Sequence, residues 1–174
     1  MTYLSTIGLP NYFSSYKLSD GSLVNVQILD TAGQERFKSI NTNYYQRADC
    51  CLLVYDVTNK NSFNECKDYF NEKIQENCKE NIQVILLGNK TDLVNQREVT
   101  PDEGANLGLE NNYIFIETSC LKNENVSDAF ETLIEITNRE AIKNKSKGNN
   151  KSENIIISKE KNKINKKKNK NCCK

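Results

Sequence analysis

Two polar motifs in this chain each follow closely on a short apolar run. Asp30-Thr31-Ala32-Gly33-Gln34-Glu35 comes after the run Leu23 to Leu29, and Asn89-Lys90-Thr91-Asp92 comes after Gln83 to Leu87. The carboxyl ends of the strands in an open α/β sheet lie at one edge, and ligands bind there. The two motifs therefore predict an α/β domain with a polar site at that edge.

The strands are predicted from short apolar runs that alternate with helical patterns, which indicates crossover helices and a mostly parallel sheet. Tyr12 to Leu18 and Leu23 to Leu29 flank the turn residues Ser19-Asp20-Gly21 and predict a hairpin at the antiparallel edge of the sheet, with Val24, Val26 and Ile28 on one face. Three further strands are predicted to be buried on both faces: Cys50 to Tyr55, Gln83 to Leu87 and Tyr113 to Ile116.

Three helices are predicted from apolar spacing and capping residues. One covers Ser62 to about Asn77, and another begins at Thr100, a capping residue followed by Pro101 and by Glu103, which can reach back to the cap. The third runs from about Asn125 to Ala141. The buried side of the first helix is predicted to hold Phe63, Cys66, Phe70 and Ile74, and that of the third Phe130, Leu133, Ile134 and Thr137.

Charge divides the chain into two parts. Its 174 residues suit one domain, predicted over residues 1–142, and the Lys/Asn-rich residues 143–174 are predicted to be a disordered tail. The formal net charge of +1 hides 12 Lys and 2 acids in the tail, so the tail is near +10 and the domain near −9. The acidic domain argues against nucleic acid as a partner. The basic tail favours an anionic membrane surface, or else only makes the chain soluble.

Seven cysteines without a histidine or a Cys-x-x-Cys spacing predict neither a disulfide framework nor a zinc site. This usage favours a reducing, cytosolic compartment. Cys50 and Cys51 open an apolar strand and are predicted to be core residues on its opposite faces. No stretch reaches the roughly 18 apolar residues of a membrane span, so a membrane contact would need an anchor.

The motifs together resemble those of the Rab branch of the Ras-superfamily small GTPases. The likeness runs from Thr2 to about Glu140, and includes Gln34-Glu35-Arg36-Phe37 and Glu117-Thr118-Ser119-Cys120. It implies the P-loop NTPase-like small GTPase fold. The chain contains no Gly-x-x-x-x-Gly-Lys-Ser/Thr phosphate loop, so we expect this fold without its first strand, phosphate loop and first helix. Two strand edges should then lack a neighbour.

The resemblance implies a site for GTP or GDP with Mg²⁺. The hydroxyl of Thr6 and the carboxylate of Asp30 would hold the metal, the Gly33 N–H would approach the γ-phosphate, and Gln34 would orient the attacking water. GTP hydrolysis is implied only for a protein that has the phosphate loop.

Base recognition is implied for the second motif. Asp92 would accept from guanine N1–H and N2–H₂, Asn89 would face the N7 edge, and the stem of Lys90 would lie along base and ribose. Ser119 and Cys120 match the third guanine element, in which the backbone N–H of Cys120 would bind the base oxygen. Leu121 replaces a Lys that the family usually has beside the base.

The switch regions are implied at Ile7 and Gly8 in switch I and at Phe37 and Tyr45 in switch II, the two aromatic residues facing effectors. Leu9-Pro10-Asn11, Leu29 and Arg47 depart from the usual Rab residues, so the effectors cannot be named from the family. Other implied partners are exchange factors, GTPase-activating proteins, a GDP-dissociation inhibitor, and the escort protein and prenyltransferase of Rabs.

Cys172 and Cys173 resemble the double-cysteine ending that is prenylated in Rabs. Two lipid chains beside a basic segment would hold the protein on the cytoplasmic face of intracellular membranes, where Rabs regulate vesicle traffic. Two hypotheses follow: a Rab-type GTP-binding switch, or a non-catalytic, lipid-anchored module that engages escort proteins or effectors.

Overall fold

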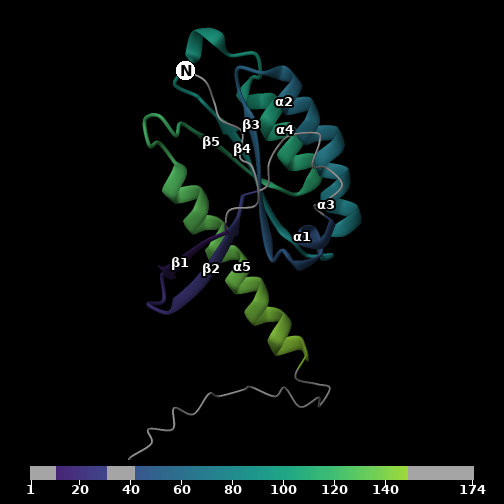
Figure 1. The fold of residues 1–174 in the computed structure, drawn as a ribbon, viewed down its shortest axis with the longest axis vertical. Helices are drawn as coiled ribbons and strands as arrows, with labels where there is room; N and C mark the ends of the chain where they lie inside the picture. The colour runs from purple at the N-terminus through teal and green to yellow at the C-terminus, as the bar shows by residue number, and fades with distance from the viewer. Residues whose placement is uncertain (1–10, 31–41, 149–174) are drawn as a thin grey trace, which may run out of the picture.

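The computed structural model describes residues 11–30 and 42–148. In chain order the strands are β1 (Asn11–Lys17), β2 (Leu23–Leu29), β3 (Cys50–Asp56), β4 (Gln83–Asn89) and β5 (Ile114–Thr118). The helices are α1 (Thr42–Arg47), α2 (Lys60–Glu65), the π-helix η2 (Cys66–Phe70), α3 (Asn71–Asn77), the 3₁₀ turn η3 (Val94–Gln96), α4 (Pro101–Asn111) and α5 (Val126–Gly148). Figure 1 shows the sheet between α2, α3 and α4 on one side and α5 on the other. The structure is a mixed α/β domain, as the sequence predicts.

The strands form two separate sheets in the described part of the chain. β3, β4 and β5 are parallel in the order β3-β4-β5, as the sequence predicts, and β1 pairs with β2 in an antiparallel hairpin. The prediction that the hairpin is an edge of the same sheet is wrong here, because within the described residues β2 has no ladder to β3.

The central strand β4 is buried on both faces, as predicted, but its neighbours β3 and β5 are not. Five consecutive residues of β4 are buried, but Val54 of β3 is 51% exposed and Ile114 of β5 is 39% exposed. Val54 lies beside an apolar hollow of about 140 Å³ that is also lined by Leu52 and by Phe130 of α5. The prediction is therefore wrong for β3 and β5, because the helices cover only part of their surface.

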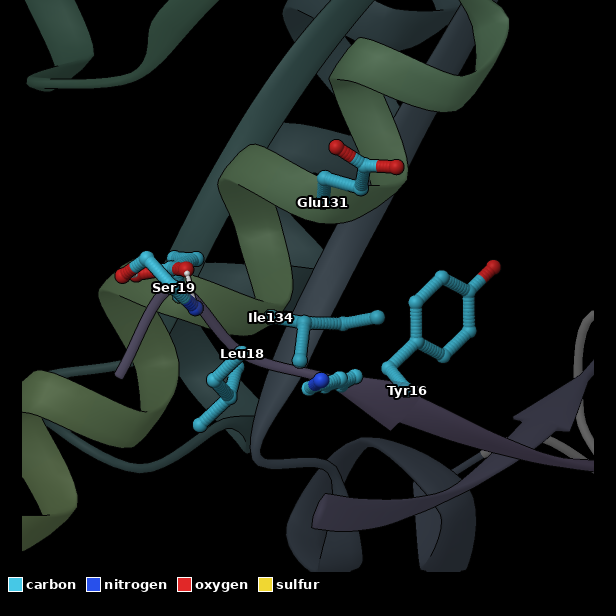
Figure 2. A pocket seen from close by; sticks show the side chains of 7 residues that line it. Tyr16, Leu18, Ser19, Glu131 and Ile134 are labelled. Atoms are coloured by element: carbon cyan, nitrogen blue, oxygen red, sulfur yellow. Dashed lines mark hydrogen bonds between the residues drawn. The ribbon is translucent and has the colours of Figure 1, made fainter. Parts of the chain in front are cut away.

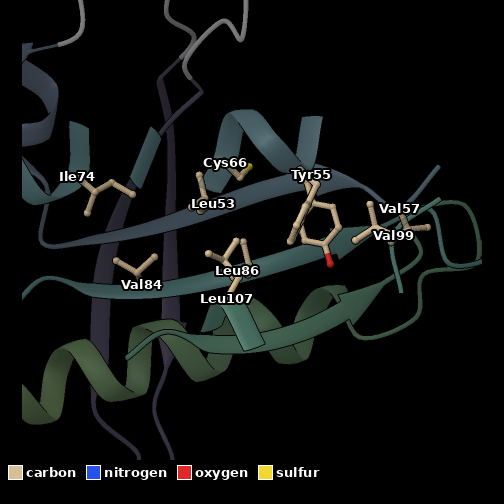
Figure 3. Close-up of a cluster of buried hydrophobic side chains, with 10 residues drawn as sticks. Leu53, Tyr55, Val57, Cys66, Ile74, Val84, Leu86, Val99 and Leu107 are labelled. Atoms are coloured by element: carbon tan, nitrogen blue, oxygen red, sulfur yellow. The ribbon is translucent and has the colours of Figure 1, made fainter. Parts of the chain in front are cut away.

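The predicted helix after β3 is present as the series α2, η2 and α3. It begins at Lys60, two residues early, because the side chain of Asn59 accepts from the Asn61 and Ser62 N–H groups. One face of this series covers the sheet in the core shown in Figure 3, where Phe63, Cys66 and Ile74 are buried as predicted. Phe70 is only partly buried at the edge of this core.

The predicted start of α4 is confirmed in each particular. Thr100 accepts from the Glu103 N–H, the Glu103 carboxylate accepts from the Thr100 N–H at 3.0 Å, and Pro101 occupies the first helical position. The helix ends at Asn111, and the residue that caps it, Asn112, has a left-handed backbone with φ 59°.

Helix α5 packs on the second face of the sheet and is longer than predicted. Ala129 and Leu133 lie against Ile85 and Leu87 of β4. The helix continues to Gly148, six residues into the segment for which the sequence predicts no structure, and residues 141–146 are exposed along it. Among the helices of residues 11–30 and 42–148, none is both long and apolar enough to cross a bilayer.

The cysteines of β3 are core residues on opposite faces, as predicted. Cys51 packs against the cluster that includes Cys66, whereas Cys50 packs against the cluster under α5. Burial raises the pKa of Cys51 and of Cys66 to about 12. Both thiols are therefore protonated at neutral pH and behave as small apolar groups.

The hairpin is tied to α5 at its turn (Figure 2). The backbone N–H and hydroxyl of Ser19 donate to the Glu135 carboxylate at 2.8 and 3.1 Å. The adjacent Leu18 is 7% exposed, and with Ile134 it lines a pocket of about 200 Å³ between the turn and the helix. A polar anchor beside one buried leucine thus positions the hairpin.

Candidate functional site

Polar residues end three neighbouring strands at one edge of the sheet. Asp56, Asn89 and Thr118 are the last residues of β3, β4 and β5, and the register pairs Asp56 with Asn89 and Asn89 with Thr118. The apolar character of each strand ends here, where the sheet meets its loops. This is the carboxyl edge at which the sequence predicts a site.

Asn89 is held by the loop after β5. Its Oδ1 accepts from the Cys120 N–H at 3.2 Å and from the Thr118 hydroxyl at 3.3 Å. Since a backbone N–H can only donate, the amide oxygen must face Cys120, which turns the Asn89 Nδ2 away. That NH₂ group has no partner among the described residues and can donate to a ligand acceptor.

Asp92 is oriented by a buried serine. The Ser119 hydroxyl donates to the Asp92 Oδ1 at 2.6 Å and accepts from the Lys122 N–H at 3.1 Å, while Ser119 itself is fully buried. The second oxygen of Asp92, Oδ2, has no hydrogen bond within residues 11–30 and 42–148. A half-buried carboxylate held in this way can accept from N–H donors of a ligand.

The loop after β4 is fixed to the loop after β5 by a third residue. Thr91 donates from its N–H and its hydroxyl to the Thr118 carbonyl at 3.2 and 3.1 Å. Asn89, Thr91 and Asp92 thus each hydrogen-bond to the segment Thr118 to Cys120. The second and third predicted guanine motifs therefore form one cluster.

Lys90 reaches across the sheet edge to β3. Its Nζ lies 2.5 Å from the Asp56 Oδ2, and its backbone is left-handed with φ 71°. Asp56 also accepts at Oδ1 from the Thr58 N–H and hydroxyl, at 2.9 and 2.7 Å. Burial alone would raise the pKa of Asp56, but the hydrogen bonds from Lys90 and Thr58 outweigh it and hold the pKa below its usual value.

Sequence reasoning did not include Asp56 in the site. The signal was present, because Asp56 closes an apolar strand just as Asp30 does. Its partner could not be identified from the chain, since Lys90 is 34 residues away and the pairing depends on the parallel register of β3 and β4.

The role of the Cys120 N–H in binding a base oxygen stays a prediction. The structure gives this N–H a protein acceptor, the Asn89 Oδ1, so a base oxygen would have to share or displace that bond. The Cys120 side chain is exposed, and Leu121 beside it is 83% exposed.

Known proteins similar to this chain point to one family. Residues 1–139 match the family model of the Ras family. The human Ras-related protein Rab-8B is 40% identical over 132 residues, which are 76% of this chain and 63% of that protein. The bovine Ras-related protein Rab-8A is 41% identical over 132 residues, which are again 76% of this chain and 63% of that protein. The GTP-binding protein ypt2 of Schizosaccharomyces pombe is 37% identical over 156 residues, which are 90% of this chain and 77% of ypt2.

The chain belongs to the Rab branch of the Ras family. It spans 63% of the length of the Rab-8 relatives that it matches. The cluster around Asn89, Asp92 and Ser119 is thus a feature of a Rab-family domain.

The remaining predicted Rab residues are placed only in part. Asp30 follows β2 and is exposed. Within the described residues no three acids, cysteines or histidines are grouped to hold a metal, although the oxygens of Asp30 are donors of the kind that Mg²⁺ prefers. Predicted residues that lie outside the described ranges are Thr6, Ile7, Gly8, Gly33, Gln34, Phe37, Cys172 and Cys173.

Tyr45, predicted to face effectors, is only partly accessible. It lies in α1, is half-buried, and packs against the core that contains Cys51 and Cys66. Burial, together with the nearby Cys51, raises the pKa of Tyr45 to about 12. The part of the ring that packs against the core is not available to an effector, and contact of Tyr45 with effectors stays a prediction.

Proposed function

We propose that this Rab-family protein binds GDP and GTP and acts as a switch in vesicle trafficking. The observation that carries the proposal is the pair Asn89 and Asp92 at the carboxyl edge of the sheet. Among the described residues, the Asn89 NH₂ group and the Asp92 Oδ2 have no hydrogen-bond partner, and each side chain is held by the loop after β5. This combination complements an acceptor and two N–H donors, which is the pattern of guanine but not of adenine.

The other parts of the switch are proposed from family membership. Asp30 and Thr6 would ligate Mg²⁺, the Gly33 N–H would contact the γ-phosphate, and Gln34 would orient water for hydrolysis. Ile7, Gly8, Phe37 and Tyr45 would contribute to binding of effectors and regulators.

Membrane attachment is proposed through prenylation of Cys172 and Cys173, presented by an escort protein to the prenyltransferase. The 12 lysines of residues 143–174 would add electrostatic attraction to an anionic cytoplasmic leaflet, because one lipid chain alone binds only marginally. Exchange factors, GTPase-activating proteins and a GDP-dissociation inhibitor are the proposed regulators. The intact mass of the endogenous protein, before and after removal of lipid, tests this anchor directly.

Nucleotide binding is tested by titrating the full chain with a fluorescent GDP and competing with other nucleotides. GDP and GTP should compete, and ATP should not. Asp92→Asn should weaken GDP binding by about a hundredfold or more, because a carboxylate acceptor becomes an amide. The same variant should gain affinity for xanthosine diphosphate, whose C2 carbonyl can accept from the new NH₂ group.

Asp68→Asn is the matched control, since Asp68 is an exposed carboxylate of η2 and the chemical change is the same. It should leave both affinities unchanged. A wild-type chain that is folded and binds neither GDP nor GTP would contradict the proposal and favour the lipid-anchored binding module. Equal affinity for ADP and GDP would contradict the assignment of Asn89 and Asp92 to base recognition.

A further inference from the structure

We infer that Asp56 is a positioning residue of the guanine-nucleotide site, which it serves by holding the Lys90 side chain across the ends of β3 and β4. The inference rests on the proposed function and extends it to a residue outside the three predicted guanine motifs. It also connects the site to Thr58 and to the first turn of α2.

The geometry of Asp56 gives each carboxylate oxygen a different partner. Oδ1 accepts twice from Thr58 and Oδ2 pairs with the Lys90 Nζ at 2.5 Å. The backbone is fixed as well, because the Asp56 N–H donates to the Ser62 hydroxyl at 3.0 Å and the Asp56 carbonyl accepts from the Asn59 N–H at 3.0 Å. The carboxylate is therefore set in place before it meets the lysine.

Lys90 is an unusual residue for its backbone conformation. Four residues other than glycine have positive φ in the described part of the chain, and the other three are Asn112, Asn123 and Asn125. Asparagine tolerates the left-handed region, whereas a long side chain on Cβ is disfavoured there. Lys90 therefore holds a disfavoured backbone, and its flexible four-carbon stem needs a partner to direct the amine, which Asp56 supplies.

An ordinary surface ion pair is the competing interpretation. Many exposed Asp–Lys pairs contribute little, and this chain has one for comparison: Lys79 lies 2.5 Å from Asp49, with side chains 55% and 75% exposed, just before β3 begins. The Lys90 and Asp56 side chains are only 39% and 21% exposed and lie beside Asn89, to which Asp56 is paired in the sheet. An Asp–Lys ion pair thus lies at each end of β3, exposed at Asp49 and partly buried at Asp56.

The test uses the full chain with Asp56→Asn, Lys90→Met and the double variant, with Asp49→Asn as the matched control. Asp56→Asn keeps the shape of the side chain and should weaken GDP binding about tenfold, as loss of a charge-assisted contact predicts. In the Lys90→Met background the same change should have no further effect on the GDP affinity, because Asp56 acts through the lysine. Asp49→Asn should leave the affinity as it is.

A second measurement reports on the lysine without nucleotide. Acylation of Lys90 by an amine-reactive reagent, followed by mass spectrometry, should be faster in Asp56→Asn than in the wild type, whereas Asp49→Asn should leave the Lys90 rate unchanged. Unchanged labelling of Lys90 in Asp56→Asn would overturn the inference whether or not GDP binds. So would an equal loss of affinity in both backgrounds, which would mean that Asp56 is merely structural. Failure of the wild type to bind GDP would overturn the proposed function, and with it this role.

Thr58→Val provides a graded check. It removes the hydroxyl that donates to Asp56 and keeps the branched shape and the backbone N–H. A smaller loss of GDP affinity, again absent in the Lys90→Met background, is expected. A loss that persists there would show that Thr58 contributes by another route.

Discussion

The β3–β4–β5 sheet and the β1–β2 hairpin are stabilised in different ways. The sheet has buried side chains against helices on both faces, with Leu86 and Ile85 of β4 fully buried. The hairpin exposes Phe13 at 76% and Leu23 at 72%, and is tied to α5 by the Ser19 bonds to Glu135. Packing thus fixes the sheet that carries the candidate site, whereas hydrogen bonds and one buried leucine, Leu18, fix the hairpin at its turn. The hairpin should be able to open while the sheet stays folded.

The largest difference is expected from shortening a leucine in each region. Leu86→Ala should lower the free energy of unfolding by about 3 kcal/mol, because it leaves a cavity in a closed core. Leu23→Ala, at a site that is 72% exposed, should lower it by less than about 0.5 kcal/mol. Urea unfolding of the two variants measures both, and similar losses would contradict the contrast between the regions.

Replacing a glycine by alanine should destabilise the two regions for different reasons. A Cβ on Gly104 would lie 2.5 Å from ring atoms of Phe115 and from the Tyr55 hydroxyl, so Gly104→Ala should destabilise by about 1–2 kcal/mol although alanine favours a helix. A Cβ on Gly21 meets nothing within 4 Å, but its φ of 85° strains any L side chain.

Asparagine distinguishes these causes, because it tolerates a left-handed backbone but is larger than alanine. In thermal unfolding, Gly21→Asn should be milder than Gly21→Ala, and Gly104→Asn should be worse than Gly104→Ala. The opposite order at either position would contradict the cause assigned to it.

The buried hydroxyl of Tyr55 should lower the free energy of unfolding of the sheet region. Within the described residues the Tyr55 hydroxyl has no hydrogen-bond partner, although the residue is 2% exposed, and burial raises its pKa. Tyr55→Phe should therefore stabilise by about 1 kcal/mol. Tyr113→Phe is the control, since its hydroxyl donates to the Asn71 Oδ1 at 2.6 Å, and it should lose about 1 kcal/mol. Chemical denaturation decides the sign of each, and destabilisation by Tyr55→Phe would point to a partner for its hydroxyl.

The smallest effect is expected at the hairpin anchor and should be local. Ser19→Ala and Glu135→Gln should speed hydrogen exchange of β1 and β2 amides while the midpoint of global unfolding stays the same. Glu131→Gln, on the preceding turn of α5, is the matched control. Faster exchange in β4 as well would mean that the hairpin and the sheet open together.

The same anchor should depend on pH. Hydrogen bonds from the Ser19 N–H and hydroxyl lower the pKa of Glu135 below 4.5, so the folded form holds this carboxylate ionised more firmly than the unfolded form does. The stabilisation is fully present above about pH 4.5 and is lost as the pH falls through the lowered pKa. Hairpin protection factors should fall in that acid range in the wild type and should not in Glu135→Gln.

Prediction from sequence succeeded where the signal is local. The capping box at Thr100, the strand at Gln83 and the turn at Ser19-Asp20-Gly21 each follow from a few consecutive residues, and the structure confirms them. It failed where exposure depends on distant neighbours. Val54 belongs to an apolar run that is typical of a buried strand, but it lines a hollow. Tyr45 is an aromatic residue predicted to face effectors, but it packs against the core.

The sequence by itself determined the family, the α/β order of elements and the two motifs of the candidate site, because motif residues and hydrophobic periodicity are written along the chain. Only the tertiary structure decided how those motifs are held. The bonds of Ser119 to Asp92, of Cys120 to Asn89 and of Asp56 to Lys90 join segments that are far apart in sequence. Such pairs depend on which strands are neighbours and in what register, and packing of the whole domain fixes both.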